Sequence, residues 1–247
     1  MIQSEAIIRS LETGNPSAVL DLISEDRYIQ HNQHFPDGRQ ILVHMLPELP
    51  KAGTKARPVR SFVDGDYAVH HTEYVLFGKH QVGFDVFRSE NGKVVEHWDN
   101  LQEWAGPNPD GNSMIDGATT VTDLERTASN KRVVEDLITE VFQNHKYQKL
   151  PEYISTTTYI KHNPHVADGL AGLKAAGPLL AKFQYRKVHK ILGQGNFVLA
   201  MSEIGFDGQD AAVYDLFRLE GGKVVEHWDV LEMALPAEQR KNANGKF

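Results

Sequence analysis

The chain has 247 residues, more than the roughly 100–200 of a typical domain, so its length favours two domains. Its 40% hydrophobic and 24% charged residues are ordinary for a globular protein, and no stretch approaches the roughly 18 apolar residues of a membrane span. The net charge of -7 argues against a nucleic-acid-binding protein, and the lack of cysteine excludes disulfides and thiolate metal sites. Because the N-terminal segment has no basic leader region, we expect a cytoplasmic location.

The first half is expected to begin with helices and to end with strands. Its first apolar residues recur at helical spacing, and two more helices are expected at about 16–24 and 39–49. Four later ranges have the alternation of strands: about 59–63, 67–77, 81–89 and 93–103. Helices followed by an antiparallel meander indicate an α+β fold.

The second half shows the same order of elements. Apolar residues between Val133 and Phe142 recur at helical spacing, with Ser129 or Asn130 placed as the N-cap. Shorter helices are expected at about 149–155 and 170–183, and the strands follow 130 residues after those of the first half.

An internal repeat explains this likeness. The eleven residues from Tyr28 to Gly38 return as Tyr159 to Gly169, with seven identities at a separation of 131. The segment Gly92–Asp99 returns unchanged as Gly222–Asp229, at a separation of 130. A period of this length is a whole domain rather than a solenoid repeat. The sequence therefore predicts one α+β fold twice, in tandem.

The segment between the two copies is rich in Gly, Pro, Asn and Asp and looks like a linker. Its Asn108–Asn112 stretch is echoed by Asn242–Lys246 at the C-terminus. We therefore expect a first domain at 1–117 that includes a tail, a linker at 118–128, and a second domain at 129–247 with its own tail. Each tail is expected either to lie back on its own sheet or to be solvated.

The last strand of each copy carries a His-x-Asp pair. His227 and Asp229 fall on one face of their strand, as do His97 and Asp99, because side chains alternate between faces. We expect both pairs in the concave face of each sheet. The alternative is that they cap a sheet edge or lie in solvent.

Asp215 and its counterpart Asp85 lie in the preceding strand, where aspartate is disfavoured. A two-residue hairpin loop would place Asp215 opposite Trp228, whereas a three-residue loop would place it opposite His227. We favour the three-residue loop because it gathers the polar groups on one surface.

The repeated Tyr-Ile-x-His-Asn-x-His segment is a second candidate wall of the pocket. Its histidines are His31 and His34 in the first copy and His162 and His165 in the second. With His227 they are possible metal ligands, but neither helical spacing nor an additional carboxylate strengthens that interpretation. We expect hydrogen-bonded pocket histidines and no bound metal.

These segments, with the Asp-x-Phe-Arg strand, resemble the SnoaL-like family of the nuclear-transport-factor-2-like superfamily, over nearly all of both halves. The resemblance implies a cone-shaped, cystatin-like domain with a hydrophobic pocket and cofactor-free polyketide cyclase chemistry. It implies a general base at Asp229 and Asp99, and a second pocket residue, histidine in the cyclases, at Asp215 and Asp85. Ketosteroid isomerases of the superfamily would have their base at Asn163 and Asn32, which cannot abstract a proton.

Together these residues predict a cofactor-independent lyase or cyclase acting on a small carbonyl compound. Asp229 or Asp99 would remove a proton α to the carbonyl, and a protonated Asp215 or His162 would hydrogen-bond the enolate. An apolar pocket would raise the pKa of the base. The remaining candidate site residues are Asp85, His97 and His31, with Tyr159, Asn163, His165, Asn32 and His34 expected to contact the ligand. The alternative function is a small-molecule binding or interaction module without turnover.

The two copies are expected to pair within one chain as a pseudo-dimer around Trp98 and Trp228, with further oligomerisation possible. Pro164 is expected to pre-set the second pocket, and His70 and His71 are expected to reshape the first. The sequence therefore predicts that the second copy carries most of any activity.

Overall fold

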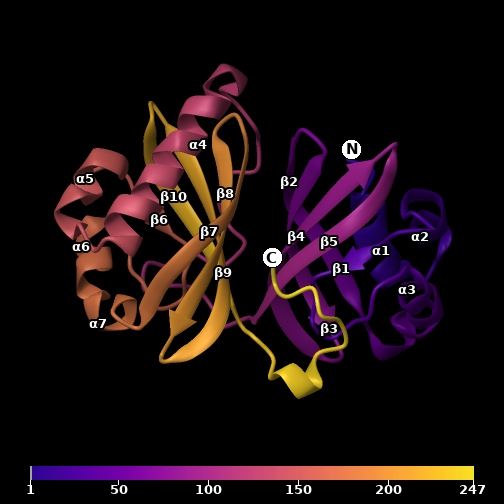
Figure 1. Ribbon diagram of the computed structural model, residues 1–247. Coiled ribbons are helices and arrows are strands. Elements are labelled where there is room, and N and C mark those ends of the chain that lie inside the picture. Colours follow the sequence, from indigo (N-terminus) through magenta and orange to yellow (C-terminus); the bar gives the residue numbers. More distant parts are fainter. Residues whose placement is uncertain (1) are drawn as a thin grey trace. The chain divides into compact units, whose positions relative to one another are not determined.

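The computed structural model describes residues 2–247, and the chain forms two compact units (Figure 1). The first unit comprises the residues up to Trp104 together with Ala234–Phe247, and the second unit comprises Ala105–Met233. Each unit has one five-stranded sheet, with strand orders β1-β5-β4-β3-β2 and β6-β10-β9-β8-β7. This confirms the prediction of an α+β fold in two tandem copies. No helix within residues 2–247 is long and apolar enough to cross a membrane.

The first unit begins with short helices and continues into long antiparallel strands, as expected. Its helical elements are α1 (Glu5–Thr13), α2 (Ser17–Leu22), α3 (Gln40–Met45) and the 3-10 turns Leu46–Glu48 and Pro50–Ala52. Its strands are β1 (Ile29–Gln30), β2 (Lys55–Asp64), β3 (Tyr67–Leu76), β4 (Lys79–Glu90) and β5 (Lys93–Glu103). The short β1 pairs in parallel with β5, and the remaining neighbours are antiparallel.

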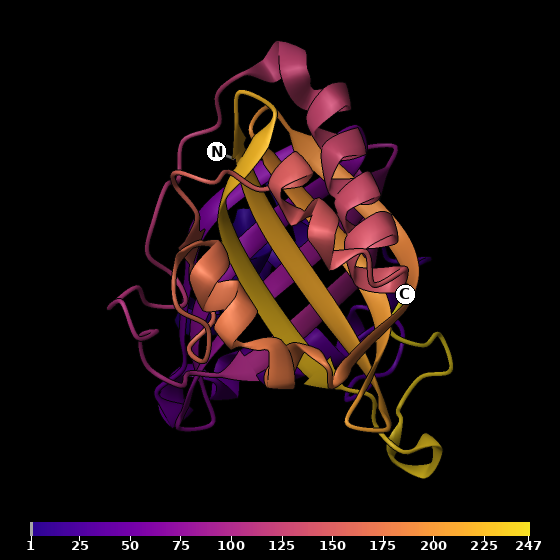
Figure 2. The same cartoon turned by 90° about the vertical axis from the view of Figure 1, so that its left-hand side faces the viewer.

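The second unit repeats this arrangement. Its helical elements are Leu124–Arg126, α4 (Thr127–Asp136) with its π-helical continuation Leu137–Gln143, Tyr147–Lys149, α5 (Leu150–Tyr153), α6 (Gly169–Ala175) and α7 (Gly177–Leu180). Its strands are β6 (Ile160–Lys161), β7 (Phe183–Gln194), β8 (Phe197–Phe206), β9 (Gln209–Glu220) and β10 (Lys223–Met233). In Figure 2 the helices lie across one face of this sheet. The expected cap residues Ser129 and Asn130 lie inside α4, because Asn130 turns inward and donates to the carbonyl of Gly195.

Each unit has its own hydrophobic core between helices and sheet. In the second unit, Leu137, Ile138 and Val141 pack with Val198 and Phe217 of the sheet. In the first unit, Ile7, Ile8 and Leu46 pack with Tyr74 and Phe87. Burial of these side chains fixes the helices over one face of the sheet, so the polar residues on that face end in a closed interior.

The hairpin between β9 and β10 differs from the expected three-residue loop. Lys223 pairs with Glu220 across a two-residue Gly221-Gly222 turn, but a β-bulge at Val225 then shifts the register. Asp229 therefore pairs with Asp215, and both side chains lie on the face of His227. The same bulge occurs at Val95, where Asp99 pairs with Asp85. The expected clustering of polar groups is correct, but the bulge produces it and the loop does not.

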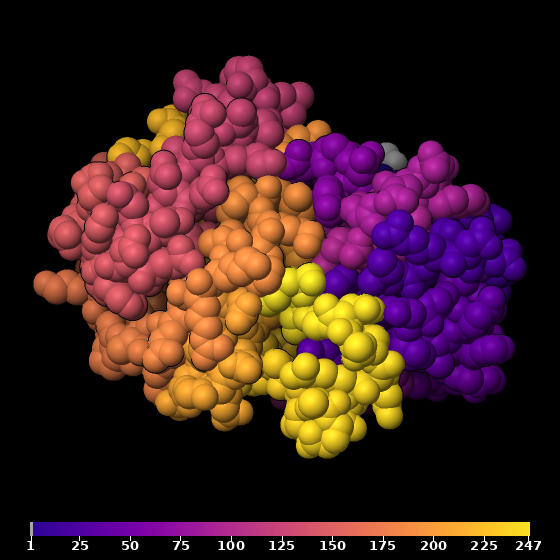
Figure 3. Space-filling model, viewed as in Figure 1, coloured from indigo at the N-terminus to yellow at the C-terminus, as the bar shows by residue number. Residues whose placement is uncertain are grey.

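The tails do not lie on their own sheets, and they are not loose in solvent. Residues 105–123 pack within the second unit, where Asn112 donates to Asp168 and the carbonyl of Ser113 contacts His162. The C-terminal tail packs within the first unit, where Asn244 donates to Asp37. Figure 3 shows this tail, in yellow, against the surface of the first unit.

The unit boundaries therefore differ from the predicted 1–117 and 129–247. Asp37 and Asp168 are equivalent positions of the two copies, and an asparagine of each tail donates to this aspartate and to the backbone carbonyl of the Gln30 or Lys161 position: Asn244 in the first unit and Asn108 in the second. The predicted linker at 118–128 is also ordered, since Thr122 exchanges backbone and side-chain hydrogen bonds with Asn196 of the second unit.

Candidate functional site

A carboxylate–imidazole–carboxylate cluster lies at the same place in each unit. In the first unit it consists of Asp85 on β4 with His97 and Asp99 on β5, and all three are buried. In the second it consists of Asp215, His227 and Asp229. One ligand atom from each residue lies within 4.8 Å of the others, so either cluster has the donors and spacing to hold a cation.

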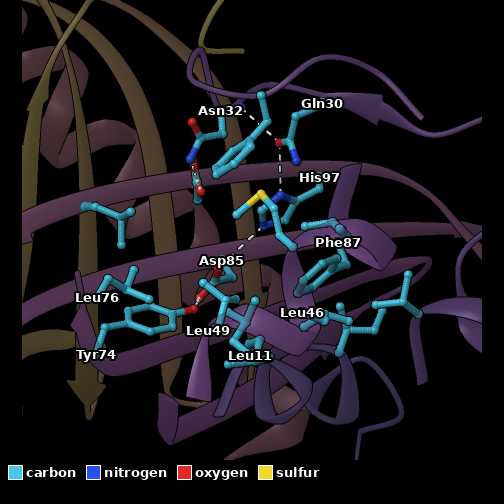
Figure 4. Close-up of a pocket in the computed structure, with 18 of the residues that line it drawn as sticks. Leu11, Gln30, Asn32, Leu46, Leu49, Tyr74, Leu76, Asp85, Phe87 and His97 are labelled. Carbon is cyan, nitrogen blue, oxygen red and sulfur yellow. Dashed lines mark hydrogen bonds and ion pairs between the residues drawn. The ribbon is translucent and has the colours of Figure 1, made fainter. Parts of the chain in front are cut away.

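The first cluster closes the polar end of an otherwise apolar cavity of about 100 Å³. The walls include Leu11, Leu46, Leu49, Leu76 and Phe87, which Figure 4 shows around Tyr74 and the polar residues. Such a pocket suits a small, mainly apolar ligand with one polar group.

Gln30 sets the hydrogen bonding of His97 (Figure 4). The side-chain amide oxygen of Gln30 (Oε1) accepts from the backbone amide of Asn32 at 2.9 Å and lies 3.0 Å from Nδ1 of His97. Because that oxygen only accepts, Nδ1 must donate. Nε2 of His97 then faces Asp85, 3.4 Å away.

The two carboxylates of the first cluster have different partners. Asp85 accepts hydrogen bonds from the hydroxyls of Tyr74 at 2.7 Å and Thr72 at 3.0 Å. Asp99 accepts from the Asn32 side-chain amide at 2.7 Å and lines the apolar cavity. Both carboxylates line the cavity, Asp85 with two hydroxyl donors on one oxygen and Asp99 with the Asn32 amide on one oxygen.

The second cavity is smaller, about 40 Å³, and contains a lysine side chain that sequence reasoning missed. The ammonium of Lys161 lies 2.6 Å from Nδ1 of His227 and 2.9 Å from Oδ2 of Asp229. Lys161 occupies the position of Gln30, and its side chain is only 3% exposed. The Lys161 side chain therefore lies between the imidazole and the second carboxylate of this cluster, where the first unit has the side-chain amide of Gln30 beside His97.

The Lys161 ammonium reverses the hydrogen bonding of the imidazole. Because Lys161 donates to Nδ1 of His227, Nδ1 is the acceptor and Nε2 carries the proton, which it donates to Asp215 at 2.9 Å. Asp215 also accepts from the hydroxyl of Tyr185 at 3.0 Å. Asp215 is thus an acceptor on both sides, which does not fit the predicted enolate donor.

The charges around the second cluster shift its pKa values. Burial lowers the pKa of His227, and the charge of Lys161 lowers it further, so His227 is neutral at pH 7. Burial by itself would raise the pKa of Asp229, but Lys161, His227 and hydrogen bonds from Lys161 and Asn163 outweigh it and lower the pKa. The expectation of a raised pKa at this aspartate is wrong, because a buried cation was not anticipated.

His162 and His31, predicted as pocket residues, lie on the opposite face of the sheet. His162 contacts Glu226 at 2.9 Å and stacks on Trp228 with ring centroids 4.7 Å apart. His31 contacts Glu96 and Trp98 in the same way. The β1 and β6 strands alternate, so Tyr159, Lys161 and Asn163 face the pocket and His162 cannot.

The other predicted ligand-binding residues divide in the same manner. Tyr159 and Asn163 line the second pocket, and Asn32 lines the first. His34 and His165 are exposed and line neither pocket, so the proposed set of histidine metal ligands is not brought together.

His70 and His71 do not line the first cavity. His70 is held between the hydroxyls of Ser4 and Ser61, and His71 contacts Arg60 and stacks on Phe84.

One signal in the sequence pointed to the missed lysine. Gln30 and Lys161 occupy one of the variable positions of the repeat, two residues from the tyrosine before and the asparagine after, so strand alternation places them on the pocket face. The repeat did not reveal the tyrosines that donate to Asp85 and Asp215. Tyr74 lies on β3 and Tyr185 on β7, and these strands are not equivalent in the two copies.

No family model matches this chain, and no curated protein matches it either. Similar solved structures include an NTF2-like protein of unknown function from Mesorhizobium loti. It is 22% identical, covers 40% of this chain and 88% of its own, and has a TM-score of 0.36. A provisionally named SnoaL-like polyketide cyclase from Jannaschia sp. CCS1 is 18% identical, covers 47% and 92%, and has a TM-score of 0.37. A provisionally named polyketide cyclase from Bacillus cereus is 16% identical, covers 40% and 72%, and has a TM-score of 0.36.

Proposed function

We propose that the first unit binds a small, largely apolar carbonyl compound and removes a proton α to its carbonyl group without a cofactor. Asp99 is the base in this proposal. The observation that carries it is the placement of a buried carboxylate, held by Asn32, at the polar end of the apolar cavity. A base in such a site works on a substrate from which water is excluded.

Tyr28 is the proposed donor to the enolate oxygen. It lines the same cavity, and burial together with the negative charges of Asp99 and Asp85 raises the pKa of its hydroxyl, which therefore keeps its proton. A neutral hydroxyl donor stabilises an enolate as negative charge develops on its oxygen. The enolate then attacks a second carbonyl carbon of the substrate in the cyclase reaction, and Asp99 returns its proton to the new alkoxide.

The second unit is less suited to this reaction, which reverses the expectation from the sequence. Asp229 is ion-paired with Lys161, and a carboxylate with a lowered pKa is a weaker base. The remaining cavity is also smaller. We therefore assign proton abstraction to Asp99 rather than to Asp229.

Exchange of α-hydrogen for deuterium tests the proposal before the natural substrate is known. A panel of small ketones and β-dicarbonyl compounds is incubated with the full chain in D₂O, and loss of the α-proton signal is followed by NMR. We expect exchange of at least one compound, and an exchange rate about a hundredfold lower for Asp99→Asn. The matched control, Asp229→Asn, should keep the rate.

The competing function is a binding module without turnover. If compounds of the panel raise the melting temperature but none exchanges its α-hydrogen, the pocket binds without catalysing. Exchange that persists in Asp99→Asn would show that Asp99 is not the base. Both results would end the proposal in its present form.

A further inference from the structure

The second cluster contains the parts of an activated nucleophile. Lys161 Nζ, His227 and Asp215 form a continuous chain of hydrogen bonds, with steps of 2.6 Å and 2.9 Å. A nucleophile bound to a base that is itself oriented by a carboxylate is the recurring arrangement of covalent catalysis. We propose that Lys161 forms an imine with a small aldehyde or ketone in the second pocket, as a site separate from Asp99.

His227 is placed to take a proton from Lys161. Nε2 of His227 donates to Asp215, so the lone pair of the imidazole is on Nδ1, which lies 2.6 Å from Lys161 Nζ and 3.2 Å from the hydroxyl of Tyr159. Because Nδ1 lies this close to Lys161 Nζ, the imidazole is placed to take the proton that must leave before the amine attacks a carbonyl carbon.

The reaction balances without any group from outside the site. The nitrogen of Lys161 bonds to the carbonyl carbon, and the carbon–oxygen bond breaks. Two of the three ammonium protons leave with the oxygen as water, one of them by way of His227, and the third stays on the iminium nitrogen. One positive charge is present before and after, so the iminium nitrogen can restore the ion pair that the ammonium makes with Asp229 at 2.9 Å.

The position of Lys161 also favours a small carbonyl compound as its partner. It lines a cavity of about 40 Å³ together with Tyr159, Tyr185 and Asn163, which has room for only a few heavy atoms. The first unit has Gln30 at this position, and an amide cannot form an imine. The inference therefore applies to the second unit alone.

Reductive trapping with acetaldehyde and sodium cyanoborohydride tests the inference on the full chain. Random alkylation modifies exposed lysines such as Lys51, which is 69% exposed, before buried ones. We expect the opposite order, with Lys161 ethylated about tenfold or more faster than Lys51 when the peptides are quantified by mass spectrometry. Ethylation of Lys51 and other exposed lysines ahead of Lys161 would overturn the inference.

Two variants test the activating chain, with Lys51 in the same sample as the internal reference. His227→Leu removes the acceptor, and Asp215→Asn presents an amide donor to Nε2, which moves the imidazole proton to Nδ1. Both should reduce labelling of Lys161 about tenfold relative to Lys51, and ¹⁵N NMR of His227 should report the change of tautomer in the second variant. Asp85→Asn, its counterpart in the first unit, should leave labelling unchanged.

An unchanged labelling ratio in both variants of the second unit would contradict activation by His227. Asp99→Asn should have no effect on labelling, so failure of this inference and failure of the proposed function of the first unit are separate results. Lys161→Gln supplies the blank, because the first unit already folds with glutamine at the equivalent position.

Discussion

The two units have the same fold and the same Asp–His–Asp cluster, yet one residue gives the clusters different chemistry. Gln30 accepts a hydrogen bond from Nδ1 of His97, whereas Lys161 donates one to Nδ1 of His227. The first cluster therefore leaves Asp99 facing an open apolar cavity, and the second is neutralised internally by a cation. The comparison teaches that a repeated Asp–His–Asp motif takes on different hydrogen bonding and charge when one neighbouring residue changes.

The largest expected effect is on the stability of the second unit. Lys161→Met leaves the Asp229 carboxylate buried without its ion-pair partner, which should cost about 3–5 kcal/mol. The matched change Gln30→Met removes only neutral hydrogen bonds and should cost about 1–3 kcal/mol in the first unit. Urea denaturation followed by hydrogen exchange in each unit measures both values. Equal losses would mean that Lys161 is not a buried counter-ion.

The next effect is a loss of stability at acid pH, which His70 should cause in the first unit only. Burial lowers the pKa of His70 to about 4, with Asp85 and Glu5 opposing the shift, while the second unit has Ala200 instead. The folded pKa lies below the unfolded value of about 6.5, so the folded state binds fewer protons and loses stability as the pH falls through this window. The whole loss is complete below pH 4 and amounts to at most about 3 kcal/mol.

His70→Ala tests this prediction by its pH dependence rather than by its absolute stability. The stability difference between the variant and the wild type should shrink by up to about 3 kcal/mol between pH 7 and pH 4. Hydrogen exchange in the first unit is the measurement. A difference that is the same at both pH values would show that His70 titrates normally.

A smaller effect is expected when the first cluster is given the charge of the second. Gln30→Lys places an ammonium beside Asp99 and should lower the pKa of that carboxylate by one to three units. The weaker base should reduce the proposed α-hydrogen exchange about tenfold. The reciprocal Lys161→Gln should leave exchange by the first unit unchanged. An unaltered rate in Gln30→Lys would show that the charge at this position does not control the base.

The smallest effects concern the exchanged tails. Asn244→Ala removes the hydrogen bonds to the Asp37 side chain and to the backbone carbonyl of Gln30. Asn112→Ala removes those to the Asp168 side chain. Each should cost about 1 kcal/mol. Hydrogen exchange should increase around residues 28–38 in the first variant and around 159–169 in the second. The reverse assignment would mean that each tail lies on its own repeat.

Much of this organisation was predictable from the sequence because it depends on local patterns. Helical and strand periodicities gave the order of the elements in both units, since burial of one apolar face is visible in a single segment. The repeat with a period near 130 predicted the tandem architecture. Alternation on the last strand correctly placed His227 with Asp229, and it would also have excluded His162 from the pocket had it been applied to the segment after Tyr159.

The pairing of the two copies around Trp98 and Trp228 stays a prediction. Neither tryptophan lines the two cavities described above, and Trp228 donates its indole proton to the carbonyl of Asp116 within the second unit.

Only the tertiary structure decided the features that depend on contacts between residues far apart in the sequence. The bulges at Val95 and Val225 set which aspartate faces which, and a bulge leaves no mark in the period of a strand. The buried ion pair of Lys161 joins residues 68 positions apart, and its energy depends on their shared desolvation. Both repeats present the same Asp-Gly turn, so no local pattern of the sequence distinguishes the repeat on which each tail packs in the structure.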